Sequence, residues 1–376
     1  MRVPFFDPTR SAAAVEAELT EAFLRVLRSG RYILGPEVEE LEAACSRMLG
    51  APHSIGVSSC TDALLSSMMA LDLHPGDEVI CPSYTFFSTA GSIARLGGRP
   101  VFADILPGSF TLDPADVARR ITSRTVGIVA VHLFGLPADM DSLLDIARRG
   151  GLWVIEDCAQ AMGADLGDRC AGTLGTLGCY SFFPTKNLGG FGDGGLVVTA
   201  DAALARRVRA LRGHGAETKH NHQIVGGNFR IDALHAALLL VKLKTFDADL
   251  DRRRQNAALY DALLTGADLP IDLGDRPPGH AFNQYVIRIR GDGARDRLRQ
   301  SLAERGIGTE IYYPVPLHLQ PAFASLGGSP LPISESAARE SLALPIFPGL
   351  EETEIRAVAQ TIESHAERAA TMRPPR

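Results

Sequence analysis

The chain has 376 residues, of which 45% are hydrophobic and 22% charged, and its formal net charge is −6. These proportions are typical of a globular protein with two domains or one large one, and the acidic balance argues against nucleic acid or an anionic membrane as the main partner. No run reaches the roughly 18 apolar residues of a membrane span, and residues 1–10 have no apolar signal core. Six cysteines without a Cys-x-x-Cys pair suit a reducing compartment. We therefore expect a cytoplasmic protein that binds neither nucleic acid nor membrane.

The first part of the chain alternates between helical and strand-like segments. Residues 12–28 carry an apolar stripe at helical spacing, and further helices are predicted at 61–73 and 140–149. Short apolar runs, rich in Val, Ile, Phe or Cys, predict buried strands at 54–57, 78–81, 100–103, 125–131, 153–156, 179–183 and 195–199. This alternation predicts an α/β fold with a mostly parallel sheet covered on both faces.

The pattern changes after about residue 245. Residues 247–264 look helical, and a segment rich in proline and glycine follows at 274–279. A strand is then predicted at 284–290, and helices at 295–305 and 352–364. We predict a large α/β domain over residues 1–245, which includes the N-terminal helix, and a small α+β domain over residues 246–376.

Polar residues follow several predicted strands, where open α/β sheets bind ligands. Residues 58–62 (SSCTD) open a helix and offer hydroxyl and backbone N–H groups to an anion, although a plain helix cap has the same pattern. Another strand ends in Glu156 and Asp157, with Gln160 three residues on. A carboxylate in this place can hold a cation or a protonated ring nitrogen, or it can cap a helix.

Lysine is scarce in this chain. Of 38 basic residues only four are lysines, namely Lys186, Lys219, Lys242 and Lys244. Lys186 lies between an apolar strand and a glycine-rich loop, where partial burial would lower its pKa and favour the neutral amine that attacks carbonyl groups. Because arginine cannot form a Schiff base, Lys186 is the main candidate for a catalytic lysine.

Three other patterns carry less weight. Residues 190–195 match G-x-G-x-x-G, but a strand-like run rather than a helix follows them, so we reject a dinucleotide fingerprint. His214, His220 and His222 lie in a polar loop without the further ligands of a zinc site, and we expect no metal. Residues 225–234 open a helical stretch and by themselves indicate only helix capping.

Taken together, these segments resemble the DegT/DnrJ-type (StrS-like) sugar aminotransferases, a family of enzymes that depend on pyridoxal 5'-phosphate (PLP) and have the aspartate-aminotransferase fold (fold type I). The order and spacing of many short motifs carry the resemblance, which covers nearly the whole chain. The matching segments are 59–64, 82–87, 156–160, 181–189, 192–195, 228–232, 313–318 and 344–348.

The resemblance implies a role for each residue around the cofactor ring. Lys186 would form the Schiff base with PLP and then move the proton between the substrate carbon and the cofactor. Asp157 would pair with the ring nitrogen and keep the ring an electron sink. Gln160 would bond the phenolic oxygen, and Phe86 would stack on the ring.

The resemblance also implies how the phosphate and the substrate are held. Thr61, the backbone of Asp62 and Ser181 would bind the phosphate. Asn228 would reach the same phosphate from the other subunit of a homodimer with shared active sites. The candidate substrate contacts are Arg230, Tyr312 and His318.

The implied reaction moves an amino group from an amino acid, expected to be L-glutamate, to a keto group of a nucleotide-linked sugar in amino-sugar biosynthesis. A 3-keto sugar is favoured over a 4-keto sugar. Tyr312 stands where relatives that act on uronic sugars have histidine, which favours a neutral sugar.

Three alternative functions remain open. A related sugar dehydratase would have histidine in place of Lys186. A regulator that keeps the fold without turnover would not need intact Lys186, Asp157 and Gln160. An inosose aminotransferase would keep the same residues, so only substrate trials separate it.

Two positions depart from the family pattern. Cys60 replaces a glycine beside the phosphate loop, where a side chain is expected to crowd the approach of the backbone. His235 replaces a glutamine, and we expect little effect on the chemistry.

Overall fold

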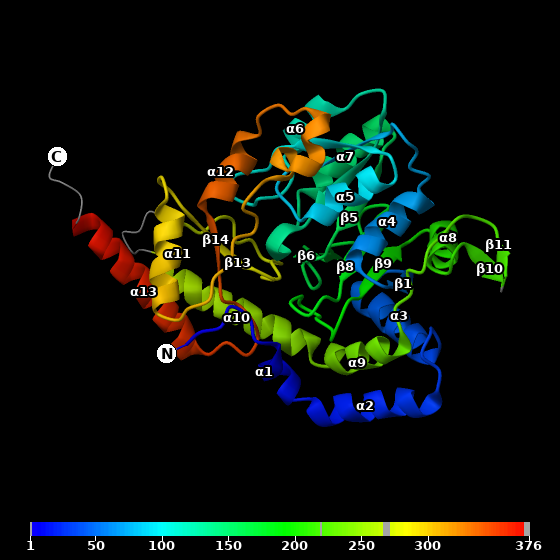
Figure 1. Ribbon diagram of the computed structural model, residues 1–376, viewed down its shortest axis with the longest axis horizontal. Helices are drawn as coiled ribbons and strands as arrows, with labels where there is room; N and C mark the ends of the chain where they lie inside the picture. Colours follow the sequence, from blue (N-terminus) through cyan, green and yellow to red (C-terminus); the bar gives the residue numbers. More distant parts are fainter. Residues whose placement is uncertain (1, 219, 266–270, 372–376) are drawn as a thin grey trace.

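The computed structural model describes residues 2–218, 220–265 and 271–371 (Figure 1). In this part of the chain, a seven-stranded sheet with helices on both faces is joined by a long helix to a three-stranded sheet with its own helices.

The large sheet is mixed and mostly parallel. Its strands, in spatial order, are β1 (His53–Val57), β9 (Gly195–Thr199), β8 (Leu177–Ser181), β5 (Trp153–Asp157), β4 (Thr125–Val131), β2 (Glu78–Pro82) and β3 (Arg99–Ala103). Only β9 runs antiparallel to its neighbours, β1 and β8, and the other pairs are parallel. The predicted α/β fold with a mostly parallel sheet is confirmed, and the sheet topology is that of fold type I.

Side chains alternate between the two faces of this sheet, as the two-residue period of a strand requires. Val129 and Ile155 pack on one face against α4 (Cys60–Ala70), α5 (Phe87–Arg95) and α8 (Ala202–Arg212). Ile128 and Val154 pack on the other face against α6 (Pro114–Arg120) and α7 (Met140–Gly150). Because both faces are covered, the strands are apolar throughout, which explains the continuous apolar runs in the sequence.

The rest of the second face is covered by α3 (Pro36–Leu49) and α9 (Ala233–Leu243). The N-terminal segment contains two helices, α1 (Pro8–Ala13) and α2 (Glu16–Ser29), where the sequence pattern predicted one over residues 12–28. The longer of them, α2, packs along α9 on the side away from the sheet, through an apolar cluster that includes Val26 and Val241 (Figure 1).

The helix α10 (Phe246–Leu264) joins the two sheets. Its first turns, with Phe246 and Leu250, belong to the core under the large sheet, whereas Tyr260 and Leu264 belong to the second core. The second core contains the sheet β12 (Ile271–Asp272), β13 (Tyr285–Ile289) and β14 (Ser341–Leu344), with α11 (Ala294–Glu304), α12 (Pro332–Glu340) and α13 (Glu352–Thr371) beside it.

The start of the chain lies on this second core. Val3 is buried there and pairs with Ile307, and Arg10 donates hydrogen bonds to Glu354. A division of the chain at residue 245 therefore separates the two sheets, while residues near the N-terminus lie with the second one.

Short elements complete the described part of the chain. Two strand pairs project from loops, β6 (Asp165–Leu166) with β7 (Arg169–Cys170) and β10 (Ala216–Thr218) with β11 (Asn221–His222). Short 3-10 helices follow β4 at η1 (Leu133–Gly135) and precede α12 at η2 (Leu317–Leu319) and η3 (Pro321–Leu326). Of the helices described, none combines the length and apolar character needed to cross a membrane.

Candidate active site

A cavity of about 550 Å³ lies at the carboxyl ends of the parallel strands, where the fold was expected to bind a ligand. It brings together seven of the residues predicted from the sequence, namely Thr61, Phe86, Asp157, Gln160, Ser181, Lys186 and Tyr312. The other wall is formed by Gln284, which directly precedes β13, and by residues 311–313 from the segment after α11. The site thus lies between the two cores.

Lys186 occupies the loop that follows β8. Its backbone N–H donates to the Phe183 carbonyl at 2.9 Å, which closes a turn before the glycine-rich segment. Burial lowers the pKa of Lys186, while the nearby Cys60 and Asp157 raise it in part. The amine is therefore held closer to its neutral form than an exposed lysine would be, as the sequence analysis expected.

Asp157 is the last residue of β5 and is buried. The Thr89 hydroxyl donates to its Oδ2 at 2.8 Å, and the Ala159 N–H donates to its Oδ1 at 3.2 Å. Burial raises the pKa of Asp157, and these hydrogen bonds oppose that change without cancelling it. A buried carboxylate of this kind is stabilised in its ionised form by a cation, so a protonated pyridine nitrogen in the cavity fits its chemistry.

Gln160 is oriented by the backbone. The Phe134 N–H donates to Gln160 Oε1 at 2.7 Å, so the acceptor end of the amide is already used. The other end, Nε2, donates to the Tyr313 hydroxyl at 3.3 Å. A donor held in this way can bond the phenolic oxygen of a pyridoxal ring, and the residues present therefore fit this cofactor.

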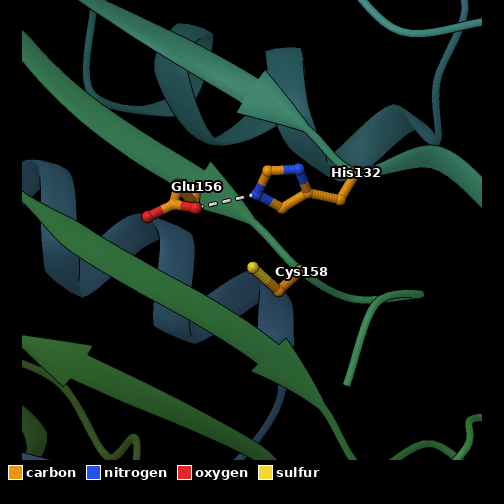
Figure 2. A group of neighbouring side chains, drawn as sticks. All are labelled: His132, Glu156 and Cys158. Atoms are coloured by element: carbon orange, nitrogen blue, oxygen red, sulfur yellow. Dashed lines mark hydrogen bonds and ion pairs between the residues drawn. The ribbon is translucent and has the colours of Figure 1, made fainter. Parts of the chain in front are cut away.

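A buried polar network supports this strand end (Figure 2). Glu156 accepts hydrogen bonds from His132 Nε2 at 2.9 Å and from the backbone N–H groups of Gly172, Leu174 and Gly175. Ala138 N–H donates to His132 Nδ1 at 2.9 Å, so the ring proton lies on Nε2. Burial opposes ionisation of Glu156, but the bonds from His132 and the backbone lower its pKa overall.

His132, Glu156 and Cys158 also have the spacing of metal ligands, because their ligand atoms lie within 4.8 Å of one another (Figure 2). The polar atoms of His132 and Glu156 are already bonded within the protein, which assigns the group to the scaffold. His214 and His222, which were considered as metal ligands, lie in an exposed hairpin. There the His222 ring bonds the His214 carbonyl at 3.0 Å.

The predicted phosphate end opens α4. Ser59 caps this helix by accepting from Asp62 N–H at 3.0 Å, and the Asp62 carboxylate accepts from the Ser58 hydroxyl at 2.7 Å. Thr61 and Ser181 line the cavity beside this turn. The Asp62 N–H is thus already paired within its own chain, and Asp62 is not one of the lining residues.

Two small features shape this end of the cavity. A Cβ on Gly195, the first residue of β9, would lie 2.5 Å from the Ser59 carbonyl carbon, so only glycine permits this approach of β9 to the phosphate loop. The Cys60 side chain is buried, with Sγ 4.0 Å from Asp157 Oδ1, and burial raises the pKa of its thiol well above the ordinary range. The thiol is therefore neutral and directed at Asp157.

Asn228 and Arg230 do not line the cavity of their own chain. Asn228 pairs with Gly213, and the Phe229 carbonyl between them accepts from Ser58 N–H at 2.8 Å. Arg230 pairs with Val57 through the backbone, and its buried Nε has no hydrogen-bond partner in the described part of the chain. The segment therefore lies against the phosphate loop without entering the cavity.

His318 also lies outside the cavity. Its Nδ1 is 2.6 Å from the Ser83 hydroxyl, and its Nε2 is 3.5 Å from Glu335 Oε1. Burial lowers the pKa of His318, and Glu335 opposes this in part. The ring thus fixes the segment after Tyr312 and Tyr313 to the loop that follows β2.

Several residues that line the cavity or support its side chains had no assigned role in the sequence analysis. Thr89 lies one helical turn after Thr85 in α5, directly after the motif at 82–87, and this spacing was a usable signal. Tyr313 was part of a matching motif, but its contact with Gln160 spans 153 residues of sequence. Gln284 is buried and lines the cavity, and only the tertiary fold places it there.

Comparisons with known proteins agree with this geometry. Residues 13–363 match the model of the DegT/DnrJ/EryC1/StrS aminotransferase family. A pleiotropic regulatory protein of Geobacillus stearothermophilus is 46% identical over 369 residues, which cover 96% of this chain and 98% of that protein. A dTDP-3-amino-3,4,6-trideoxy-alpha-D-glucose transaminase of Streptomyces venezuelae is 42% identical over 374 residues, which cover 98% of this chain and 97% of that protein.

The solved structures include a similar fold. The X-ray structure of S. venezuelae DesV in complex with a ketimine intermediate superposes with a TM-score of 0.94 at 42% sequence identity, covering 98% of this chain and 99% of that one. The arrangement of both sheets is therefore that of a known aminotransferase fold.

Proposed function

Since the chain belongs to the DegT/DnrJ/EryC1/StrS aminotransferase family, and is thus a PLP-dependent transaminase, we propose that it transfers the amino group of L-glutamate to the 3-keto group of a nucleotide-linked sugar. The observation that carries this proposal is the single cavity in which Lys186, Asp157 and Gln160 meet an aromatic wall. The relative from S. venezuelae is named for a 3-amino sugar, which favours the 3-position.

The large-sheet wall is proposed to hold the cofactor. When bound, PLP supplies an electron sink that makes the carbon bearing the amino group acidic. The carboxylate of Asp157 would pair with the ring nitrogen and keep it protonated, and Gln160 Nε2 would donate to the phenolic oxygen. Thr61 and Ser181 bind the phosphate beside the N-terminus of α4, whose N–H groups favour an anion.

Lys186 is proposed to anchor the cofactor and to carry the proton. Its amine would move a proton between the substrate carbon and the cofactor. To accept that proton, the amine must be neutral near the operating pH. The lowered pKa of Lys186 supports this role.

The aromatic wall is proposed to bind the sugar. This wall consists of Tyr312 and Tyr313. Phe86, which belongs to the large-sheet side and would stack on the cofactor ring, is 57% exposed, and its ring centroid lies 6.2 Å from that of Tyr313. Burial raises the pKa of Tyr312, so it presents a neutral hydroxyl. Tyr312 stands where relatives that act on uronic sugars have histidine, which favours a neutral sugar over a uronic one.

Completion of the site by a second copy of the chain is part of the proposal. Asn228 lies against the phosphate loop but not in the cavity of its own chain, so in a homodimer it is free to reach the phosphate of the partner. Arg230, two residues further on, is proposed to reach the substrate in the same way, and its unpartnered Nε supports this. His318 is proposed to act on the substrate indirectly, by fixing the segment with Tyr312 through Ser83.

The test is a substrate screen. The protein with PLP is incubated with L-glutamate and with matched nucleotide-linked 3-keto and 4-keto sugars, and 2-oxoglutarate and amino sugar are measured. We expect turnover with the 3-keto sugar and at least tenfold less with the 4-keto sugar. A preference for the 4-keto sugar would overturn the regiochemistry, and turnover with an inosose alone would replace the sugar.

A regulatory role is the second candidate, because one relative is named as a pleiotropic regulatory protein. The intact set of Lys186, Asp157 and Gln160 around one cavity argues for turnover. If the screen yields no 2-oxoglutarate with any keto acceptor while the protein still binds PLP, the regulatory role becomes the better account.

A further inference from the structure

The loop that carries Lys186 is closed at its base by one residue. Phe182 donates its N–H to the Gly194 carbonyl at 2.8 Å and accepts from Gly190 N–H at 2.7 Å. The segment between them leaves β8, carries Lys186, and returns to β9. Because Lys186, Asp193 and Gly194 all line the cavity, the shape of this loop sets one side of the site.

The imidazole of His235, in the first turn of α9, joins this loop through both ring nitrogens. Phe191 N–H donates to His235 Nε2 at 3.1 Å, and His235 Nδ1 lies 2.9 Å from the Asp193 carbonyl. A carbonyl accepts only, so the ring proton lies on Nδ1 and the ring is neutral. The His235 N–H in turn donates to the Asp232 carboxylate at 2.7 Å, which fixes the start of α9.

The glycines of the loop make room for this ring. A Cβ on Gly190 would overlap His235 Nε2, and a Cβ on Gly194 would lie 3.1 Å from His235 Cε1. Glycine at positions 190 and 194 thus has a physical reason, whereas Gly192 faces open space and Gly195 approaches the Ser59 backbone. Gly190 and Gly194 let the loop wrap an imidazole that comes from another element.

We propose that His235 is a positioning residue that holds the Lys186 loop in its working shape only while the imidazole is neutral, so that acidification releases the loop. A proton on Nε2 would face the Phe191 N–H, which is also a donor, and that contact would be lost. The consequence for turnover rests on the transaminase function proposed above, whereas the loop contact does not.

The charges around the ring agree with a neutral state. Burial lowers the pKa of His235, and the opposing effects of Asp232, on its own helix, and of Asp193, on the loop, are smaller. Lys242, further along α9, has its Nζ 5.8 Å from the Phe191 ring centroid. The adjoining core contributes apolar side chains. They include Val38 and Leu41 of α3 and Phe182, directly after β8.

The sign of the pH effect follows from this lowered pKa. A folded state that favours the neutral ring gains its full contribution above the ordinary histidine pKa of about 6.5 and loses it as the pH falls below that value. Loop order and turnover are therefore expected to decline together on the acidic side.

A pair of variants separates position from titration. Glutamine offers one donor and one acceptor on its amide, so His235→Gln retains both contacts without a group that titrates. His235→Leu removes both contacts while keeping an apolar side chain of similar bulk.

The experiment measures hydrogen exchange of peptides covering residues 186–195 in the PLP-loaded enzyme from pH 5.5 to 8, corrected for intrinsic exchange, together with kcat over the same range. In the parent protein, protection is expected to fall by up to about tenfold towards pH 5.5, the limit for one titrating group, and kcat is expected to fall with it. In His235→Gln protection stays constant across this range, and the acidic decline of kcat is reduced. In His235→Leu protection is low at every pH.

Two results would overturn the proposal. One is the same pH dependence of exchange in the parent protein and in His235→Gln. The other is parent-like protection at pH 8 in His235→Leu. If the protein proves not to be a transaminase, kcat disappears from the comparison, but the exchange data still decide the role of His235.

Discussion

The cavity wall on the large sheet is polar, and its side chains are held by bonds within the protein: Thr89 donates to Asp157, and Phe134 donates to Gln160. The opposite wall, from the second core, is aromatic through Tyr312 and Tyr313, and Gln284 lies in it as a buried amide. A site for one constant cofactor gains from groups fixed before binding. A site for the variable sugar needs area and adaptable contacts, which aromatic rings provide. The difference indicates that the two walls have separate tasks, and substitutions in each should fail in different ways.

The largest effect is expected on the polar wall, at its lysine. Lys186→Ala should lower kcat by at least about 10³-fold, since general acid–base catalysis alone contributes roughly 10²–10⁴-fold. Borohydride reduction of the parent protein should label Lys186, which mass spectrometry of peptides will show. The matched control is Lys244→Ala, since Lys244 is exposed and pairs with Glu18 on the surface. A label on Lys242 or Lys244 would contradict the assignment.

Asp157→Asn should cost about 100-fold in kcat, because a neutral amide no longer keeps the ring nitrogen protonated. Cofactor content is expected to stay near the parent level, since the other contacts remain. Near-parent turnover would show that Asp157 only caps the segment after β5.

The same variant has an opposite effect on stability without the cofactor. Burial raises the pKa of Asp157, so its contribution to folding is present at acidic pH and is lost as the pH rises through that raised pKa. The cofactor-free Asp157→Asn protein should therefore melt about 2 °C higher than the cofactor-free parent at pH 8 and show no gain at pH 4. If the variant and the parent melt at the same temperature at both pH values, the buried carboxylate does not destabilise the cofactor-free protein.

A mixture of two inactive variants tests whether a second chain completes the polar wall. Lys186→Ala and Asn228→Ala are each expected to impair the pure protein. After subunit exchange, half of the dimers are mixed and each has one site without a lesion, so activity should rise to about a quarter of the parent value. With exchange confirmed by mass spectrometry of the intact complex, an unchanged activity would place Asn228 in a structural role within its own chain.

The smallest effect is expected on the aromatic wall. Tyr313→Phe removes the hydroxyl that meets Gln160 Nε2 at 3.3 Å, and one net hydrogen bond of about 1 kcal/mol corresponds to roughly fivefold in rate. The loss should appear with the sugar and not in the reaction of glutamate alone, if the two walls have separate tasks. An equal loss of rate in the half-reaction with glutamate and in that with the keto sugar would show that the two walls do not have separate tasks.

The sequence by itself determined the alternation of strands and helices and the polar residues at the strand ends. Both follow from local rules, because a strand buried on both faces must be apolar throughout, and parallel strands present their carboxyl ends at one edge. For that reason the sequence predicts Asp157, Gln160 and Lys186 as site residues, the family resemblance adds Ser181, and the structure has all four around one cavity.

Only the tertiary structure decided which distant residues share the site. Gln284 and Tyr313 line the cavity because α10 joins the second core to the first. His318 lies outside the cavity, where its ring bonds Ser83. Likewise, His235 is far in sequence from Gly190 and Gly194, but its ring packs against both glycines. Such contacts depend on packing between elements far apart in the chain, and neither periodicity nor local spacing records them.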